Sequence, residues 1–207
     1  AGNRHSLFID GEGRLSSCGS EAGQAPGLLG HGEGVTRLNT PTRLPSMPGE
    51  RVMSVTAGAA HSLALTTDGS VWNWGYGRDG KLGHGDEQRQ LLPKKVEALA
   101  GQCVVAVSAG GAHTLALTAD GAVWSWGGGA FGQLGHGDQQ SQLLPTKVEA
   151  FIGRRVIAVS AGARHSLAIT ADGAVFTWGV GEDGCLGHGE DLSNQLLPKK
   201  VEAGGGE

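Results

Sequence analysis

The chain has 207 residues, 38 of them glycine, and 39% of the residues are apolar while 17% are charged. This composition suits a single globular domain or a short repeat array, because runs of valine, leucine and tryptophan argue against disorder and the glycines lack the every-third-residue spacing of collagen. Lys and Arg number 16 against 20 Asp and Glu, a formal net charge of −4, so we do not expect nucleic-acid binding driven by a positive field.

The cysteines and the hydropathy of the chain indicate in which compartment we expect the protein. Cys18, Cys103 and Cys185 show no CxxC spacing, and three cysteines are too few for a disulfide framework or a cysteine-based zinc site. We therefore expect reduced thiols and an intracellular protein, cytoplasmic or nuclear. No apolar run approaches the ~18 residues of a membrane span, so no membrane partner is expected.

The first unit of the chain is atypical, and three regular units come after it. It opens at residues 1–5 without the short apolar strand that begins the later units, which we place at 51–56, 103–108 and 155–160. The chain thus carries three copies of that first strand but four copies of the second, third and fourth strands.

The remaining elements are clearest in the fourth unit. A second strand is predicted over 166–170, an Asp-Gly hairpin over 171–173, a third strand over 175–178, and a fourth strand over 198–203 with Pro198 at its entry. No stretch has the 3.6-residue apolar period of a helix. Four short antiparallel strands in each complete unit of about 50 residues predict an all-β protein made of β-propeller blades.

The eight histidines define the repeat, because they fall into two registers whose last three members are 52 residues apart. The first register is His5, His61, His113 and His165, and the second is His31, His84, His136 and His188. We predict a single array over residues 1–203, with repeats at about 1–50, 51–102, 103–154 and 155–203, and a glycine-rich tail over 204–207.

One sequence run carries a family resemblance. The pattern V-x-A-V-S-A-G-x-x-H-[ST]-L-A-[LI]-T-x-D-G-x-V-[WF]-x-W-G-x-G-x-x-G-x-L-G-H-G recurs three times, and a weaker fourth copy covers residues 1–32. It resembles the regulator of chromosome condensation (RCC) repeat. The resemblance implies a seven-bladed propeller fold, and four units are fewer than one such ring. Four blades that close alone, two chains that complete one ring, and a fragment of a seven-bladed ring all remain open.

The resemblance implies several functions. Family members exchange nucleotide on a small GTPase, bind chromatin through a basic tail, sense UV-B light in plants, or act as protein-binding modules in large ubiquitin ligases and kinases. No basic tail is present here, and Asn3, Ala59, Gly111 and Ala163 stand where the photoreceptor has the tryptophan of its G-W-R-H motif. Our interpretation is a non-enzymatic protein–protein interaction scaffold whose partner is unidentified. The alternatives are a guanine-nucleotide exchange factor for a small GTPase and a substrate-recruiting module of a ubiquitin ligase.

Three motifs that can signal chemistry are better explained by structure. G-x-G-x-x-G occurs at 75–80, 127–132 and 179–184, but Leu-Gly-His-Gly comes next instead of a helix that could hold a pyrophosphate, so a recurring turn is predicted and no cofactor. The histidines stand one per blade in each register, away from cysteines and paired carboxylates, so we predict no metal and buried rings hydrogen-bonded to backbone. Ser6, Ser62, Thr114 and Ser166 each follow a first-register histidine, but neighbours on a strand point to opposite faces, so we predict no nucleophile–base pair and no catalytic residue.

Aromatic residues and variable turns supply the last candidates. The third strand of each later unit carries two aromatic residues at alternating positions: Trp72 and Trp74, Trp124 and Trp126, and Phe176 and Trp178. We expect one member of each pair to pack between blades. The first unit has Ser16 and Cys18 in place of such a pair. Turn positions whose residues differ between the copies are not required by the fold and can vary. They make up a candidate partner-binding rim of Tyr76, Arg78, Asp79, Phe131, Glu182 and Asp183. Tyr76 and Phe131 are the predicted anchors, because aromatic side chains dominate interface energetics.

Overall fold

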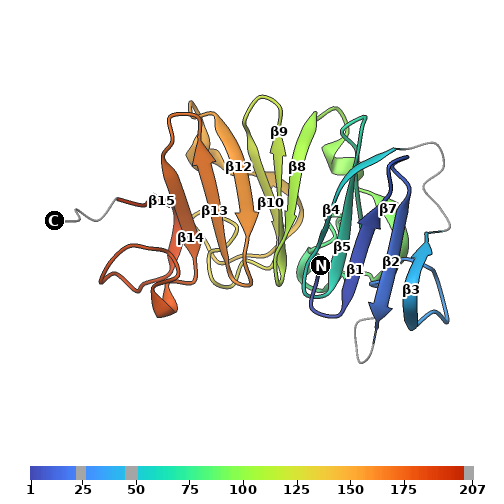
Figure 1. The fold of residues 1–207 in the computed structure, drawn as a ribbon. Helices are drawn as coiled ribbons and strands as arrows, with labels where there is room; N and C mark the ends of the chain where they lie inside the picture. The colour runs from blue at the N-terminus through green and yellow to red at the C-terminus, as the bar shows by residue number, and fades with distance from the viewer. Residues whose placement is uncertain (22–26, 45–50, 203–207) are drawn as a thin grey trace.

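Four antiparallel sheets stand side by side in chain order in the computed structural model, which describes residues 1–21, 27–44 and 51–202 (Figure 1). We call the sheets blades 1 to 4. Blade 1 comprises β1 (His5–Ile9), β2 (Leu15–Ser20) and β3 (Arg37–Arg43); blade 2 comprises β4 (Val52–Ala57), β5 (His61–Thr66), β6 (Val71–Gly75) and β7 (Gln90–Lys95). Blade 3 comprises β8 (Val104–Ala109), β9 (His113–Thr118), β10 (Val123–Gly127) and β11 (Gln142–Lys147); blade 4 comprises β12 (Val156–Ala161), β13 (His165–Thr170), β14 (Val175–Gly179) and β15 (Gln195–Lys200).

The predicted fold class is confirmed: the protein is all-β and built of propeller blades. Outside the strands, the helical turns of the described residues are the 3₁₀ turns η1 (Arg78–Gly80), η2 (Glu97–Leu99), η3 (Glu149–Phe151) and η4 (Glu182–Gly184). Blade 1 has three strands instead of four, as the missing apolar strand at its start predicts. The predicted tail over 204–207 lies outside the described residues.

An Asp-Gly turn fixes the register of the central hairpin in each complete blade. In blade 2 the Asp68 carboxylate accepts hydrogen bonds from the Thr66 hydroxyl (2.6 Å) and the Ser70 amide (3.1 Å), while Gly69 adopts φ +81°, which glycine tolerates without strain. Asp120 and Asp172 make the same turn in blades 3 and 4. The turn holds the second and third strands in one alignment, so their apolar residues face the neighbouring blades.

The predicted position of the fourth strand is wrong. The sequence predicts it over 198–203 with Pro198 at its entry, whereas β15 runs over Gln195–Lys200 with Pro198 inside it. A bulge lies between Thr177 and Gly179 on the adjacent strand, where the pairing register shifts, and β15 is the edge of its sheet. A proline lacks the amide hydrogen of a regular ladder, so a bulged edge strand accommodates it inside the strand as well as at the start.

Strand pairing assigns the loops to two opposite ends of the blades. His61 pairs with Gly75 and Leu65 with Val71, so the turn before β5 and the long loop after β6 share one end. We call this end, with its equivalents in the other blades, the loop rim; it comprises residues 1–4, 57–60, 76–89, 109–112, 128–141, 161–164 and 180–194. The Asp-Gly hairpins and the connections between blades form the opposite hairpin rim.

The core lies between the blades. Trp74, Trp126 and Trp178 are fully buried, each in a cluster that joins its own blade to the preceding one. Trp72 and Trp124 are partly buried against the same clusters, and Phe176 is buried. Blades 1 and 4 lie at opposite ends of the array (Figure 1), so the described residues form an open arc rather than a four-bladed ring.

Candidate interaction surface

Each junction between blades contains the same polar chain. In the first junction His5 donates Nε2–H to the Ser62 hydroxyl (2.7 Å), and that hydroxyl donates to the Leu28 carbonyl (2.9 Å). The Trp74 indole donates to the same carbonyl (3.1 Å). The second junction uses His61, Thr114, Trp126 and the Lys81 carbonyl, and the third uses His113, Ser166, Trp178 and the Gln133 carbonyl. A preceding blade therefore supplies a histidine and a loop carbonyl, and the following blade supplies a hydroxyl and an indole.

The prediction that the histidines bond to backbone is wrong for this register. Adjacent strand residues do point to opposite faces, but the hydroxyl after each histidine meets the histidine of the neighbouring blade. Because the hydroxyl hydrogen goes to the carbonyl, the ring donates from Nε2, and Nδ1 is left unprotonated with no partner among the described residues. Burial lowers the pKa of His5 to about 4 and the pKa values of His61 and His113 to about 3. These neutral, buried His–hydroxyl pairs join blades and do not expose a nucleophile.

The second register joins each long loop to its own blade. His31, His136 and His188 donate Nε2–H to Ser17 (3.1 Å), Ser125 (2.9 Å) and Thr177 (3.0 Å), and His84 reaches the Asn73 carbonyl (3.2 Å). The predicted backbone partner is thus found at His84, and backbone hydrogen bonds with Thr42 at His31 and with Ser125 at His136 oppose the lowering of their pKa values by burial. Within the described residues, no three His, Cys, Asp or Glu side chains converge as a metal site.

The six predicted rim residues all lie in the long loops of the loop rim, in three different blades. Tyr76, Arg78 and Asp79 share the loop of blade 2, where the Arg78 guanidinium lies 3.8 Å from the Asp79 carboxylate. Phe131 lies in the loop of blade 3. Glu182 and Asp183 form the exposed 3₁₀ turn of blade 4. The structure groups these residues by loop on one rim, but they do not form one pocket.

Both predicted aromatic anchors are half-buried under a cation. The Lys81 ammonium lies 5.5 Å from the Tyr76 ring centroid, and burial lowers the pKa of this lysine. The Arg164 guanidinium, from the turn of blade 4, lies 4.9 Å from the Phe131 ring centroid. Cation–π contacts of this kind attract the cation to the face of the ring. The sequence analysis did not find either cation. The distance along the chain from Tyr76 to Lys81, or from Phe131 to Arg164, does not predict that the two side chains meet.

The loop rim also carries an excess of carboxylates. Exposed acidic residues in the three long loops are Glu87, Asp138, Glu182, Asp183 and Glu190, and exposed basic residues on the same rim are Arg4, Arg78, Arg89 and Arg164. The loop rim thus combines two half-buried aromatic rings, exposed arginines and an excess of carboxylates.

Small residues line the hollow where the blades meet. Turns from all four blades surround a space of about 280 Å³, lined by residues 1–3, 57–59, 109–111 and 161–163. Asn3, Ala59, Gly111 and Ala163 are among these residues, so the positions of the photoreceptor tryptophan converge in space but hold no aromatic ring here. The Ala59 and Gly111 amides donate to the Gly110 and Gly162 carbonyls of the following blades (3.3 and 3.2 Å).

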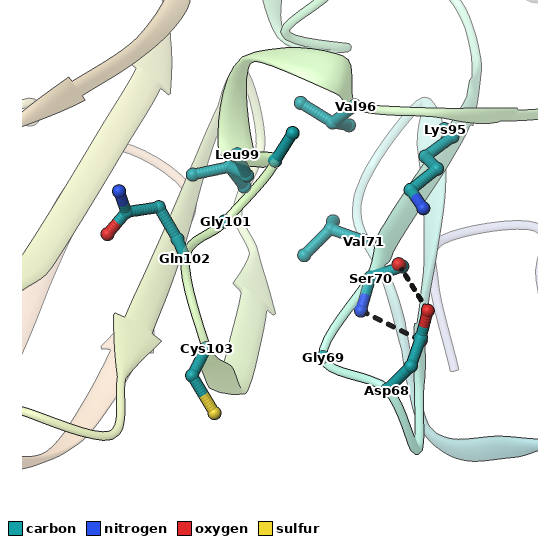
Figure 2. A pocket seen from close by; sticks show the side chains of 11 residues that line it. Asp68, Gly69, Ser70, Val71, Lys95, Val96, Leu99, Gly101, Gln102 and Cys103 are labelled. Atoms are coloured by element: carbon teal, nitrogen blue, oxygen red, sulfur yellow. Dashed lines mark hydrogen bonds between the residues drawn. The ribbon is translucent and has the colours of Figure 1, made fainter.

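A second hollow opens on the hairpin rim between blades 2 and 3 (Figure 2). It measures about 360 Å³, with Val71, Val96 and Leu99 on its apolar side and Asp68 and Lys95 at its edge. The Asp68 carboxylate already accepts hydrogen bonds from the Thr66 and Ser70 hydroxyls and the Ser70 amide, which hold its pKa well below the usual range. This carboxylate is therefore committed to the turn and is a poor general base. The equivalent hollow between blades 3 and 4 is about 160 Å³.

The junction hydroxyls of Ser62, Thr114 and Ser166 are paired with histidines of the preceding blades. No helix in the described part of the chain has the length and apolar character needed to cross a bilayer.

Comparison with known proteins agrees with this architecture. The model of the RCC1-like domain matches residues 1–206. The human E3 ubiquitin-protein ligase HERC2 is 43% identical over 204 residues, 98% of this chain but 4% of that protein. The Ultraviolet-B receptor UVR8 of Arabidopsis thaliana is 42% identical over 182 residues, 87% of this chain and 41% of that protein.

The solved structures give the same assignment. Yeast RCC1 (Prp20), in a crystal structure in which it is bound to Kap60, superposes with a TM-score of 0.85 at 25% identity, over 98% of this chain and 47% of the other. The chain therefore spans a small part of HERC2 and less than half of UVR8 and of yeast RCC1. The match of the family model to residues 1–206 shows that this chain belongs to the RCC1-like domain family.

Proposed function

We propose that this chain is a non-enzymatic protein-interaction module that binds its partner through the loop rim, with Tyr76 and Phe131 as anchors. The observation that carries the proposal is the contrast between the junctions of the blades and the loop rim. At the junctions the buried polar groups bond to one another, whereas the loop rim displays two aromatic rings, each in contact with a cation, among exposed charged residues. The binding of Kap60 to yeast RCC1, a protein of the same fold, supports a protein partner in general terms.

Affinity capture with quantitative mass spectrometry tests the proposal. The bait is the intact chain, and the comparison is the double variant Tyr76→Ala, Phe131→Ala, since loss of two anchors should weaken a genuine partner by tenfold or more, about 1.4 kcal/mol or above. Gln102→Ala, an exposed position on the hairpin rim, is the matched control. A partner retained equally by all three baits would refute the anchor assignment.

Substrate recruitment for a ubiquitin ligase is the second candidate, and the 43% identity to HERC2 favours it. The test follows the captured partner in cells that express either the native chain or the Tyr76→Ala, Phe131→Ala variant from its own locus. Recruitment predicts that the variant lowers ubiquitin conjugation of the partner and raises its abundance. Unchanged conjugation despite lost binding would rule this role out.

Nucleotide exchange is the outcome that would overturn the non-enzymatic proposal. A panel of small GTPases loaded with fluorescent nucleotide is mixed with the chain, and release is measured over time. We expect no acceleration above the spontaneous rate. A catalytic increase for any member would assign exchange activity instead.

A further inference from the structure

The polar residues at the base of the long loop differ between blade 2 and the other blades. The strand before this loop carries Ser17, Ser125 or Thr177 in blades 1, 3 and 4, and each hydroxyl donates to a loop carbonyl and accepts from a histidine. Blade 2 has Asn73 at this position. Its Nδ2 donates to the Lys81 carbonyl (3.0 Å), but its Oδ1 is buried and has no partner in the described part of the chain. A buried acceptor without a partner is costly, so stability does not explain the asparagine.

A lysine side chain is buried in the same loop. Lys81 is 5% exposed and occupies the position of Leu28 in blade 1 and Gln133 in blade 3, whose carbonyls accept the same indole hydrogen bond. Gln133 Oε1 also accepts from the Phe131 amide (2.9 Å), a contact that a lysine cannot make. Lysine is rarely buried without an anionic partner, because desolvation of an ammonium group is costly. The fold accepts leucine or glutamine here and does not require the lysine.

The carboxylates of this loop are not bonded to the Lys81 ammonium. Asp79 and Glu87 attract it electrostatically, but Asp79 lies 3.8 Å from the Arg78 guanidinium and Glu87 Oε1 accepts from the Asp79 amide (3.2 Å). Burial lowers the pKa of Lys81 in spite of these two charges, as expected where no anion lies at hydrogen-bond distance. The ammonium lies 5.5 Å from the centroid of the Tyr76 ring. A nearly buried cation is therefore placed beside one of the two proposed anchors.

We infer that the Lys81 ammonium and the Tyr76 ring form a subsite for a carboxylate of the protein partner, supplied by an aspartate or glutamate next to an apolar residue. The inference rests on the proposed function, because the subsite includes one of its anchors. Tyr76 is half-buried at the surface of the loop rim, so a group that packs on its ring comes close to the ammonium. The apolar residue packs on the ring, and the carboxylate accepts from Lys81. A hydrogen bond between two charged groups is about twice as strong as a neutral one, and water screens a partly buried pair less than an exposed one.

Selection from a random peptide library displayed on phage tests the inference, with the full chain as bait. Each recovered peptide is synthesised in two forms, one with its acidic residues and one with Asn or Gln in their place. Dissociation constants of both forms are measured for the native chain and for Lys81→Gln, which carries the side chain that blade 3 has at this position. The four values make a double-mutant cycle between the lysine and the carboxylate of the peptide.

We expect the selected peptides to be enriched in Asp and Glu beside apolar residues. The native chain should bind the acidic form about tenfold or more tightly than the amide form, and Lys81→Gln should abolish most of this preference. Arg89→Gln, which removes an exposed cation of the same loop, is the matched control and should keep it, because exposed ion pairs contribute little. A second neutral variant, Lys81→Met, guards against a folding defect caused by one substitution.

Two results would overturn the inference. One is a selection without enrichment of acidic peptides, and the other is an equal preference for the acidic form in the native chain and in both Lys81 variants. The Tyr76→Ala, Phe131→Ala variant distinguishes these results from failure of the proposed function. Peptides that lose binding to this double variant but bind equally to the native and Lys81→Gln chains would refute the subsite alone. Peptides that bind the double variant as tightly as the native chain would refute the anchors as well.

Discussion

Single hydroxyl groups connect the blades of this protein at the scale of the residue. Ser62, Thr114 and Ser166 are fully buried, and each accepts from a histidine of the preceding blade while it donates to a loop carbonyl. A hydroxyl in this position satisfies two buried polar groups at once. Its removal leaves a buried ring N–H without a partner, which costs more than the bond itself contributes.

Ser166→Ala should therefore lower the free energy of unfolding by about 1–3 kcal/mol. Ser6→Ala is the matched control, because Ser6 follows a histidine in the same way but has no preceding blade among the described residues. Urea unfolding monitored by circular dichroism measures both. Equal effects for the two variants would contradict the role assigned to the junction.

The same histidines predict how stability depends on pH. Burial lowers the pKa of His61 and His113 to about 3 and that of His5 to about 4, from an ordinary value of 6.5. The unfolded chain binds protons below pH 6.5 while the folded chain does not, so stability is full above that pH and falls as the pH drops toward these lowered values.

Urea midpoints at pH 7, 6, 5 and 4.5 should decrease in that order. The carboxylates of Asp68, Asp120 and Asp172 have pKa values lowered from 3.8, so they contribute little to stability changes above pH 4.5. A His113→Gln variant should show a flatter dependence over this interval. A midpoint that does not change between pH 7 and 4.5 would show that the rings do not stay neutral.

At the scale of the element, the long loops of blades 2 and 3 each fit against the next blade through a glycine at positive φ. Gly132 has φ +78° and Gly184 has φ +68°. Both conformations disfavour a side chain to a similar degree, but only Gly132 has a neighbouring blade against it. A comparison of substitutions at these two glycines therefore separates the cost of backbone strain from the cost of overlap with the neighbouring blade.

Gly132→Ala should destabilise the protein by about 1–3 kcal/mol more than Gly184→Ala, because the added methyl would overlap Leu196. Thermal unfolding of the two variants under one set of conditions measures the difference. Equal losses would mean that the loop of blade 3 moves away from blade 4 at little cost.

At the scale of the whole molecule, the open arc predicts a gradient of stability along the chain. β5 and β9 are covered on both faces, whereas β13 is open on one face. Repeats that contact only their neighbours gain stability from each interface, so the central blades have two interfaces and blade 4 has one.

Hydrogen exchange measured by mass spectrometry should show the slowest amides in β5 and β9 and faster exchange in β13. The difference should appear at neutral pH without denaturant. Uniform exchange across the four blades would indicate a single cooperative unit with no weaker end.

Much of this protein was predictable from its sequence. Histidine registers, Asp-Gly turns and alternating aromatic residues predicted blades, their number and the irregular first unit, because each is a local pattern that repeats. The shift of β15 to Gln195–Lys200 was not predictable in the same way, since a bulge on the partner strand sets the pairing. The rim residues were found from variation between copies, but the cations over Tyr76 and Phe131 were not.

The sequence by itself determined the repeat, the fold class and the residues that differ between blades, because local hydrogen bonds and apolar spacing act within one unit. Only the tertiary structure decided the partners of the histidines, since Ser62 lies 57 residues from His5 along the chain and meets it when two blades pack. It also decided which glycines have a neighbouring blade against them, as Gly132 has and Gly184 has not among the described residues. Contacts between units depend on how sheets stack, and no spacing within one unit encodes that geometry.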